Sequence, residues 1–263
     1  MLELHDLGFH HPGQDWVFRH TDLTIASGAI TSILGPNGKG KTTLLRCIAG
    51  LARPQEGHVV RDANIGYVPQ ATSSNVGYSV FDMVLMGCAK KVSVFGTPGK
   101  ADLALTRQSL QRVGVEHLAA SSFAELSGGQ RQLVLIARAL TTGCTFMILD
   151  EPVSALDLKN QARVLGLLGE LAAQGMGILL TTHHPDHALH LGGDAIVMYS
   201  ADEIELGAVK DLVTGANLSR LYDIDVATET ILDRGNPRTV VFTRYDNLDA
   251  VDPDRHNKES AMQ

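Results

Sequence analysis

Short apolar runs alternate along this chain with longer amphipathic stretches. Five of these runs predict strands, at residues 30–34, 65–68, 145–150, 177–182 and 195–200. Between the third and fourth runs, residues 160–175 have apolar positions at helical spacing and end on Gly175, which predicts an amphipathic helix. Strands that alternate with helices predict an α/β fold whose mostly parallel sheet is covered on both faces.

The pattern changes between residues 73 and 140, where helical spacing dominates and strand signals are few. We interpret this segment as a helical insertion that contains a loop at residues 92–102. The expected organisation is one domain with this insertion and a C-terminal extension, at residues 1–235, 73–140 and 236–263, with the core at about 1–72 and 141–210. The polar last residues, 252–263, are expected to be partly disordered.

Composition and charge narrow the class of protein. Hydrophobic residues make up 44% and charged residues 19%, an ordinary globular balance, and the net charge of −7 argues against a nucleic-acid-binding surface. The N-terminus lacks the pattern of a secretory signal, and no apolar stretch approaches the ~20 residues that span a bilayer. If the protein serves a membrane, we expect it to do so as a soluble partner. Cys47, Cys88 and Cys144 lie far apart, which predicts buried free thiols in a reducing cytosol.

The segment GPNGKGKTT follows the first predicted strand, fits the pattern G-x-x-x-x-G-K-[ST] and leads into the helix-like LLRCIAGL. Glycines let the backbone curl so that several N–H groups point at phosphate, and the positive end of the helix dipole adds to the attraction. Lys41 can reach the β- and γ-phosphates, the Thr42 hydroxyl can ligate Mg²⁺, and Thr43 can add a phosphate contact. The expected phosphate-binding loop comprises Gly35, Pro36, Asn37, Gly38, Lys39, Gly40, Lys41, Thr42 and Thr43.

An acidic pair ends the predicted strand at residues 145–150. Ligands of open α/β sheets bind at the carboxyl ends of the strands, so Asp150 is placed to hold the Mg²⁺ shell. Glu151 follows it and is placed to orient and polarise an attacking water. Together with the phosphate-binding loop, this pair indicates a nucleotide triphosphatase, and kinases, GTPases and motor ATPases all share the loop.

The stretch LSGGQRQ, residues 126–132, precedes the helix-like QLVLIARAL and then LDEP. In this order it resembles the signature motif of ABC ATPases. Gln70 in YVPQ then matches the Q-loop of that family, Asp157 in SALD its D-loop, and His183 after GILLTT its switch histidine. The resemblance runs from about Leu2 to Leu221.

This resemblance implies a RecA-like P-loop NTPase core, an antiparallel β subdomain at the N-terminus and an inserted α-helical subdomain that carries the signature. In ABC proteins, ATP lies between the phosphate-binding loop of one copy and the signature of the other, so one of each per chain implies a homodimer with two ATPs. The resemblance assigns ATP contacts to Ser127, Gly128, Gly129 and Gln130, Mg²⁺ contacts to Thr42, Gln70 and Asp150, and catalytic roles to Glu151, His183, Gln70 and Asp157.

Four histidines crowd the segment TTHHPDHALH, residues 181–190. Pairs three or four residues apart share a helix face and imidazole is a common metal ligand, so a metal site is one interpretation. The zinc-protease pattern H-E-x-x-H needs Glu at position 184, where this chain has His184. The family resemblance favours the other interpretation, in which His183 senses the γ-phosphate and His184, His187 and His190 are surface or capping residues.

Two positions depart from the family pattern. An aromatic residue near the N-terminus usually stacks on adenine, and His11 stands at about that place, with Trp16 as the second candidate. Val153 stands where a hydroxyl residue is common, and we expect little consequence from this change.

Residues 76–90 follow the Q-loop, in the region that meets the permease in ABC transporters. Within them, SVFDMVLMG resembles importers of the iron-siderophore, cobalamin and haem class, although Cys88 replaces a frequent Arg. Such importers join two ATPase subunits to two transmembrane permease subunits at the cytoplasmic face of the inner membrane, fed by an extracytoplasmic substrate-binding protein. The favoured cargo is therefore a metal chelate. The stretches EGHVVRDANIGYVPQ and SSNVGYSVFDMVLMG also resemble molybdate or tungstate importers.

Other functions fit the sequence less well. A soluble ABC ATPase without a permease, such as an iron–sulfur assembly factor, is disfavoured by the importer-like stretch at residues 76–115. ABC proteins of DNA repair or translation usually carry long coiled-coil inserts or two tandem cassettes, and this chain has neither. A non-enzymatic binding module would need a broken catalytic set, but Lys41, Asp150, Glu151 and His183 are all present.

Overall fold

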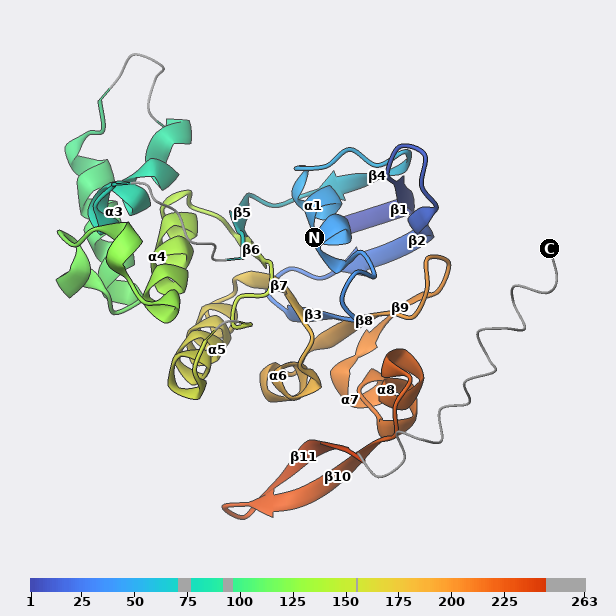
Figure 1. Ribbon diagram of the computed structural model, residues 1–263. Coiled ribbons are helices and arrows are strands. Elements are labelled where there is room, and N and C mark those ends of the chain that lie inside the picture. The colour runs from blue at the N-terminus through green and yellow to red at the C-terminus, as the bar shows by residue number, and fades with distance from the viewer. Residues whose placement is uncertain (71–76, 92–96, 155, 245–263) are drawn as a thin grey trace.

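A sheet of six strands crosses the middle of the fold (Figure 1). The computed structural model describes residues 1–70, 77–91, 97–154 and 156–244. All neighbouring strands are parallel except the last pair, which is antiparallel. The order is β5 (Ile65–Val68), β6 (Phe146–Leu149), β7 (Gly177–Thr182), β3 (Ile30–Leu34), β8 (Asp194–Met198) and β9 (Ile204–Ala208). The predicted α/β fold with a mostly parallel sheet is confirmed.

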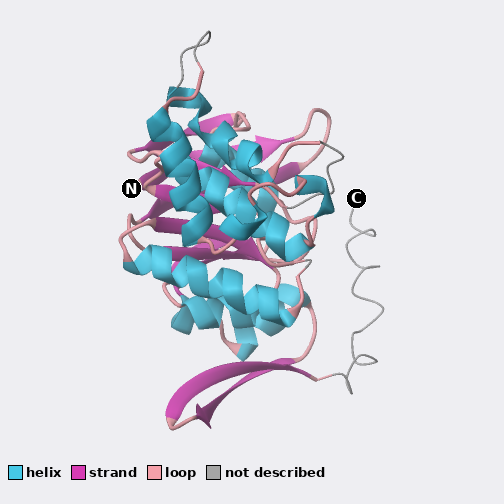
Figure 2. Cartoon of the chain, turned by 90° about the vertical axis from the view of Figure 1, so that its left-hand side faces the viewer, coloured by secondary structure: helices cyan, strands magenta, loops and turns pink. Residues whose placement is uncertain are grey.

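Helices cover the strands, as the view in Figure 2 shows. Because side chains of a strand point alternately to opposite faces, each inner strand contributes to two cores. Met147 of β6 packs in a core with helix α5 (Leu158–Ala173), and its neighbour Ile148 packs in a core with helix α1 (Lys41–Ala49). The helix predicted at residues 160–175 therefore exists, but it begins at Leu158 and ends at Ala173.

A separate antiparallel sheet lies at the N-terminal side and shares the core of α1. Its strands run in the order β2 (Trp16–Ile25), β1 (Leu2–His10) and β4 (Glu56–Arg61). Leu2, Leu4 and Leu7 of β1 are buried in that core. The antiparallel N-terminal β subdomain that the family resemblance implied is therefore present.

The elements that the structure describes between β5 and β6 are all helices, joined by loops, and Figure 1 shows this region beside the sheet. Its elements are α2 (Val80–Leu85), η1 (Met86–Lys91), α3 (Lys100–Arg112), η2 (Glu116–Leu118), η3 (Phe123–Glu125) and α4 (Gly128–Thr141). The loop expected at residues 92–102 is wrong at its end, because α3 begins at Lys100. The Gly99 N–H donates to the Asp102 carboxylate at 2.9 Å and closes that first turn, whereas residues 92–96 lie outside the described part.

A C-terminal module follows β9. It comes after residue 200 in the sequence, where the last strand predicted from the hydrophobic pattern ends. It contains α7 (Val209–Leu212), α8 (Gly215–Tyr222), β10 (Val226–Asp233) and β11 (Asn236–Thr243). The two strands pair from Val226 with Thr243 to Asp233 with Asn236, so their ladder spans the boundary expected at residue 235. Figures 1 and 2 show this hairpin apart from the main sheet. The expectation of disorder at residues 252–263 lies outside the described residues.

Two further predictions concern burial. Cys47, Cys88 and Cys144 are buried and free of disulfides, as expected, and burial raises the pKa of the Cys47 thiol to about 11, which keeps it protonated. None of the helices that the structure describes combines the length and the apolar character needed to span a bilayer.

Candidate nucleotide-binding site

The phosphate-binding loop connects β3 to α1 through glycines in the left-handed region of backbone space. Gly38 has a φ of 80° and Gly40 a φ of 88°, values that L-residues rarely adopt. A Cβ atom on Gly40 would lie 2.2 Å from Cγ1 of Val17, so glycine is also needed for the close approach of β2. The loop therefore curls tightly at the N-terminus of α1, as the motif predicts.

Lys41 is the first residue of α1, and its side chain folds back over the loop. Its Nζ donates hydrogen bonds to the carbonyl oxygens of Gly35 at 2.7 Å and Pro36 at 2.9 Å. Burial lowers the pKa of this ammonium, while the carboxylates of Glu151 and Asp150 oppose that shift. The Lys41 ammonium is thus held inside the loop by its hydrogen bonds to two backbone carbonyl oxygens.

Asp150 follows β6 and is 4% exposed. Its Oδ1 accepts one hydrogen bond from the Thr42 hydroxyl at 2.9 Å and another from the Thr181 hydroxyl at 2.9 Å. The structure therefore joins the predicted Thr42 and Asp150, which are 108 residues apart in the chain. Thr181 of β7 was missed by sequence reasoning, and the only local signal for it is its position two residues before His183.

Glu151 has a backbone φ of 43°, an unusual value for a residue with a side chain. Its N–H donates to the Thr181 hydroxyl at 2.7 Å, which holds the backbone there. Its Oε2 lies 3.6 Å from Nδ1 of His183, and both side chains are partly buried. The predicted pair of Glu151 and His183 is thus brought together at the ends of β6 and β7.

A pocket of about 310 Å³ opens beside these groups. Residues of the phosphate-binding loop, the N-terminal sheet and the end of β6 line it, namely His11, Gln14, Val17, Asn37, Gly38, Gly40, Lys41, Thr42, Thr43 and Glu151. His11 therefore borders the pocket, whereas Trp16 packs against the Arg19 guanidinium at 4.4 Å and is not among these residues. Gln14 and Val17 were missed by the sequence analysis because nothing in their local pattern marks them.

The signature residues lie at the N-terminus of α4, outside the pocket at the phosphate-binding loop. Ser127 caps α4, since its hydroxyl accepts from the Gln130 N–H at 3.4 Å and its own N–H donates to the Gln130 side-chain oxygen at 3.0 Å. Gly129 is buried, and a Cβ there would lie 2.5 Å from Cγ of Asn160 in α5. Ser127 itself is exposed, and neither it nor Gly128 lines the pocket at the phosphate-binding loop.

Gln70 and Asp157 also lie outside that pocket. The Gln70 amide donates to the Ser154 hydroxyl at 3.2 Å, which in turn donates to the Glu151 carbonyl at 3.3 Å. Asp157 caps α5 by accepting from the Asn160 N–H at 2.8 Å. In this structure the hydrogen bonds of the two residues hold the loops that follow β5 and β6, whereas the Asp150 carboxylate accepts from Thr42 and Thr181.

The remaining histidines differ in environment. His184 and His190 are exposed, and His184 occupies the N-cap position of α6 (Pro185–Leu191) without a side-chain capping bond. The expectation of a surface or capping role is wrong for His187, which is half-buried and whose Nδ1 lies 3.3 Å from the Thr182 hydroxyl. No cluster of metal-ligating side chains occurs among residues 1–70, 77–91, 97–154 and 156–244.

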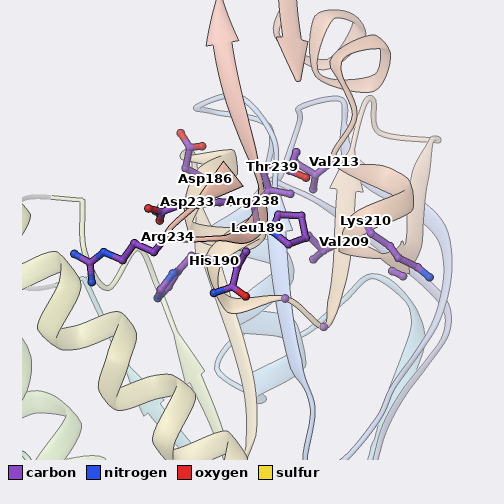
Figure 3. Close-up of a pocket in the computed structure, with 15 residues that line it drawn as sticks. Asp186, Leu189, His190, Val209, Lys210, Val213, Asp233, Arg234, Arg238 and Thr239 are labelled. Atoms are coloured by element: carbon purple, nitrogen blue, oxygen red, sulfur yellow. The ribbon is translucent and has the colours of Figure 1, made fainter. Parts of the chain in front are cut away.

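A second, larger pocket of about 860 Å³ lies between α6, α7 and the tip of the β10–β11 hairpin. Figure 3 shows the cationic side chains that line it, and those of Lys210 and Arg234 extend away from the pocket in opposite directions. Arg238 is paired with Asp233 at 3.3 Å. The cationic side chains of this pocket therefore do not converge on one point. Lys41, Thr42 and Asp150 do gather at the phosphate-binding loop, which is the candidate catalytic site.

A parallel sheet with this loop after β3, a lysine at the helix start and an acidic pair at the end of β6, two strands away from β3, defines a P-loop nucleotide triphosphatase. The profile of the family described as ABC transporter matches residues 18–154. The chain belongs to the ATP-binding subunits of the ABC transporter family, and such cassettes are ATPases.

Individual relatives match over most of their length. The chain is 38% identical to the molybdate import ATP-binding protein MolC of Haemophilus influenzae, over 85% of this chain and 88% of that protein. It is 35% identical to an iron chelatin transport ATP-binding protein of Helicobacter pylori, over 85% and 93% of the two chains. A solved inward-facing ABC transporter of the metal-chelate type matches with a TM-score of 0.89 and 36% identity, over 94% of this chain and 98% of that one.

Proposed function

We propose that this protein is the ATP-hydrolysing subunit of a binding-protein-dependent importer that takes up a metal chelate of the iron-siderophore, haem or cobalamin type through a separate permease. The observation that carries the proposal is the match to a metal-chelate type transporter over 94% of this chain. That match reaches further along the chain than the family profile, which spans residues 18–154.

Molybdate or tungstate is the second candidate cargo, because a relative at 38% identity is named as a molybdate importer subunit. The ATPase subunit does not contact the cargo, so the cargo is inferred from relatives and not from a pocket of this chain. A soluble ABC ATPase without a permease is the remaining alternative.

The phosphate-binding loop would cradle the triphosphate of ATP. The loop N–H groups and the N-terminus of α1 attract its charge, and Lys41 would exchange the carbonyls of Gly35 and Pro36 for phosphate oxygens. The hydroxyl of Thr42 and the carboxylate of Asp150 lie 2.9 Å apart and are hard oxygen donors of the kind that Mg²⁺ prefers. These two residues would hold Mg²⁺, with Gln70 as the third proposed ligand. The ion, when bound, neutralises charge on the phosphates.

Glu151 would act on the attacking water, because this residue lines the pocket and its backbone is fixed by Thr181. His183, 3.6 Å from that carboxylate, would sense the γ-phosphate and keep Glu151 in place. His11 is the proposed adenine contact because it borders the same pocket. Asp157 would act from the loop that precedes α5.

The signature would complete the site of a second copy. Ser127 is exposed at the N-terminus of α4, where its hydroxyl and the N–H groups of Gly128 and Gly129 would meet phosphate, with Gln130 as a further proposed contact. Because these groups do not line the pocket of their own chain, each ATP would need both copies of a homodimer. Subunits of this family work as dimers with membrane permeases.

The permease partner would contact the helical region between β5 and β6. Tyr78, Met86 and Leu103 are large apolar side chains there that are 45%, 40% and 37% exposed. Such exposure favours a protein contact. We propose that two permease subunits bind here, at the cytoplasmic face of the inner membrane, and that a substrate-binding protein delivers cargo from the other side.

Replacement of Glu151 by Gln tests the proposed chemistry. The amide cannot accept a proton from water, so turnover should fall by about 100-fold or more while ATP binding persists. Phosphate release measures the first effect, and light scattering with ATP should detect an accumulated dimer. Turnover at the wild-type rate would remove Glu151 from the mechanism.

Uptake into vesicles that contain the assembled complex tests the cargo. ATP-dependent accumulation of a radiolabelled iron chelate, haem or cobalamin, with no accumulation of molybdate, is the expected result. Molybdate uptake alone would establish the second candidate. Purification of the chain from cells without any membrane protein, together with no uptake of either cargo, would favour the soluble alternative.

A further inference from the structure

Three imidazole rings form a continuous contact between the end of β7 and helix α6. The ring of His183 lies 4.1 Å from that of His184, and the ring of His184 lies 4.8 Å from that of His187. At one end of this row, His183 faces the Glu151 carboxylate at 3.6 Å. The other end, His187, has no role in the proposed chemistry.

His187 is connected back to the strand that precedes His183. Its Nδ1 lies 3.3 Å from the hydroxyl of Thr182, the last residue of β7. The same hydroxyl accepts the N–H of His184 at 3.1 Å. Thr182 and His184 flank His183 in the chain, so one buried hydroxyl ties together both sides of the switch histidine and the first turns of α6.

The environment of His187 suits a neutral hydrogen-bonding partner. Burial, followed by the neighbouring His184 and His183, lowers the pKa of His187 to about 4, so its imidazole is uncharged near pH 7. A neutral ring keeps one nitrogen with a free lone pair, and Nδ1 can then accept the Thr182 hydroxyl proton. Thr182 is 2% exposed, so bulk water does not compete for that proton, and the other acceptor of this hydroxyl, the carbonyl oxygen of His184, is more distant at 3.5 Å.

We propose that His187 is a positioning residue for the switch histidine: its hydrogen bond to Thr182 fixes the turn at residues 182–184 and thereby the place of His183 relative to Glu151. The inference rests on the proposed roles of Glu151 and His183. Displacement of a catalytic group by about 1 Å can cost up to about 100-fold in rate, so a loosened turn is sufficient to slow hydrolysis.

A packing role for His187 would predict different behaviour. Phe at position 187 keeps a ring of similar size but has no nitrogen, whereas Asn loses ring volume and keeps a polar atom near the place of Nδ1. Val at position 182 keeps the shape of Thr182 without its hydroxyl, and Ser keeps the hydroxyl. Loss of function that follows the polar atom, and not the volume, identifies the hydrogen bond.

The test uses the full chain and measures kcat and KM for ATP. His187→Phe and Thr182→Val should each lower kcat about tenfold with KM changed less than about twofold, because the phosphate-binding loop is untouched. His187→Asn and Thr182→Ser should keep about half of wild-type kcat or more. The double variant His187→Phe/Thr182→Val should be no slower than the worse single variant, because both remove one interaction.

His190→Ala, exposed on the same helix, is the control and should leave kcat unchanged. Wild-type kcat in His187→Phe or Thr182→Val would overturn the inference, as would losses that multiply in the double variant or that follow side-chain volume. Glu151→Gln separates this from the proposed function. If Glu151→Gln is inactive while His187→Phe is fully active, only the positioning role of His187 is wrong. If Glu151→Gln is active, the proposed role of Glu151, on which the positioning role depends, is wrong as well.

Discussion

Glu151 shows how single residues are constrained at this site. Its backbone φ of 43° is a conformation that costs a residue with a side chain about 1–3 kcal/mol. The bond from its N–H to the Thr181 hydroxyl, 2.7 Å long, holds that conformation, and the same hydroxyl donates to Asp150 at 2.9 Å. One threonine therefore orients both members of the acidic pair.

His187 should make the stability of the fold depend on pH. Its pKa is about 4 in the folded chain, below the ordinary value of 6.5, so between these values the unfolded chain binds a proton that the folded chain does not. The contribution of the neutral His187 ring to the free energy of unfolding is therefore fully present above pH 6.5 and is lost as the pH falls toward 4. We expect a loss of about 1–2 kcal/mol, reduced from the full shift because the ring is only partly buried.

Thermal unfolding of wild type and His187→Asn at pH 7.5 and pH 5 measures this effect. The drop in Tm on acidification should be smaller by about 3 °C in the variant, since its side chain does not titrate. His190→Asn, on the exposed side of the same helix, is the control and should follow the wild type. Equal drops in all three proteins would contradict the prediction.

At the scale of elements, the pairing of β1 with β4 depends on a glycine. Gly57 has a φ of 68°, and a Cβ there would lie 2.1 Å from the carbonyl oxygen of His5 and 2.3 Å from that of Asp6. The register between these strands shifts after His5, and Asp6 itself has a φ of 46°. The two strands therefore meet at an irregular point that has no room for a side chain.

Gly57→Ala should destabilise the chain by about 3 kcal/mol or more, because strain and a clash with backbone atoms add together. Gly13→Ala is a matched control, since Gly13 has a φ of 73° but no atom within 4 Å of an added Cβ. The control should lose only about 1 kcal/mol. Denaturant titration monitored by circular dichroism measures both, and equal losses would show that strain alone matters.

At the scale of the whole molecule, the phosphate-binding loop and the signature belong to different parts of the surface. Mixing two inactive variants tests whether the phosphate-binding loop of one chain and the signature of another form one ATP site. Lys41→Ala disables the loop of one chain, and Ser127→Phe blocks the signature of the other. A mixed dimer has one site in which both defects coincide and one site that is intact.

An equal mixture should recover about a quarter of wild-type ATPase activity, because half of the dimers are mixed and each carries one working site. Each variant alone should be inactive, and phosphate release measures all three samples. Activity of the mixture equal to the sum of the separate variants would exclude a site shared between chains.

The chain's local motifs determined most of the chemistry. The glycine pattern with Lys41, the acidic pair after an apolar strand and the capped helix start at Ser127 depend on neighbours in sequence, so spacing alone predicts them. The strands of the parallel sheet were predictable for the same reason, since their burial leaves uninterrupted apolar runs.

Only the tertiary structure decided which distant residues meet. Strand order places β7 between β6 and β3, and this brings the hydroxyl of Thr181 to the carboxylate of Asp150, 31 residues away in the chain. Val17 against Gly40 is another such contact, and the C-terminal hairpin has no motif that marks it. Hydrophobic periodicity specifies which face of an element is buried, but not which element covers it, so these contacts follow from the packing of the whole chain.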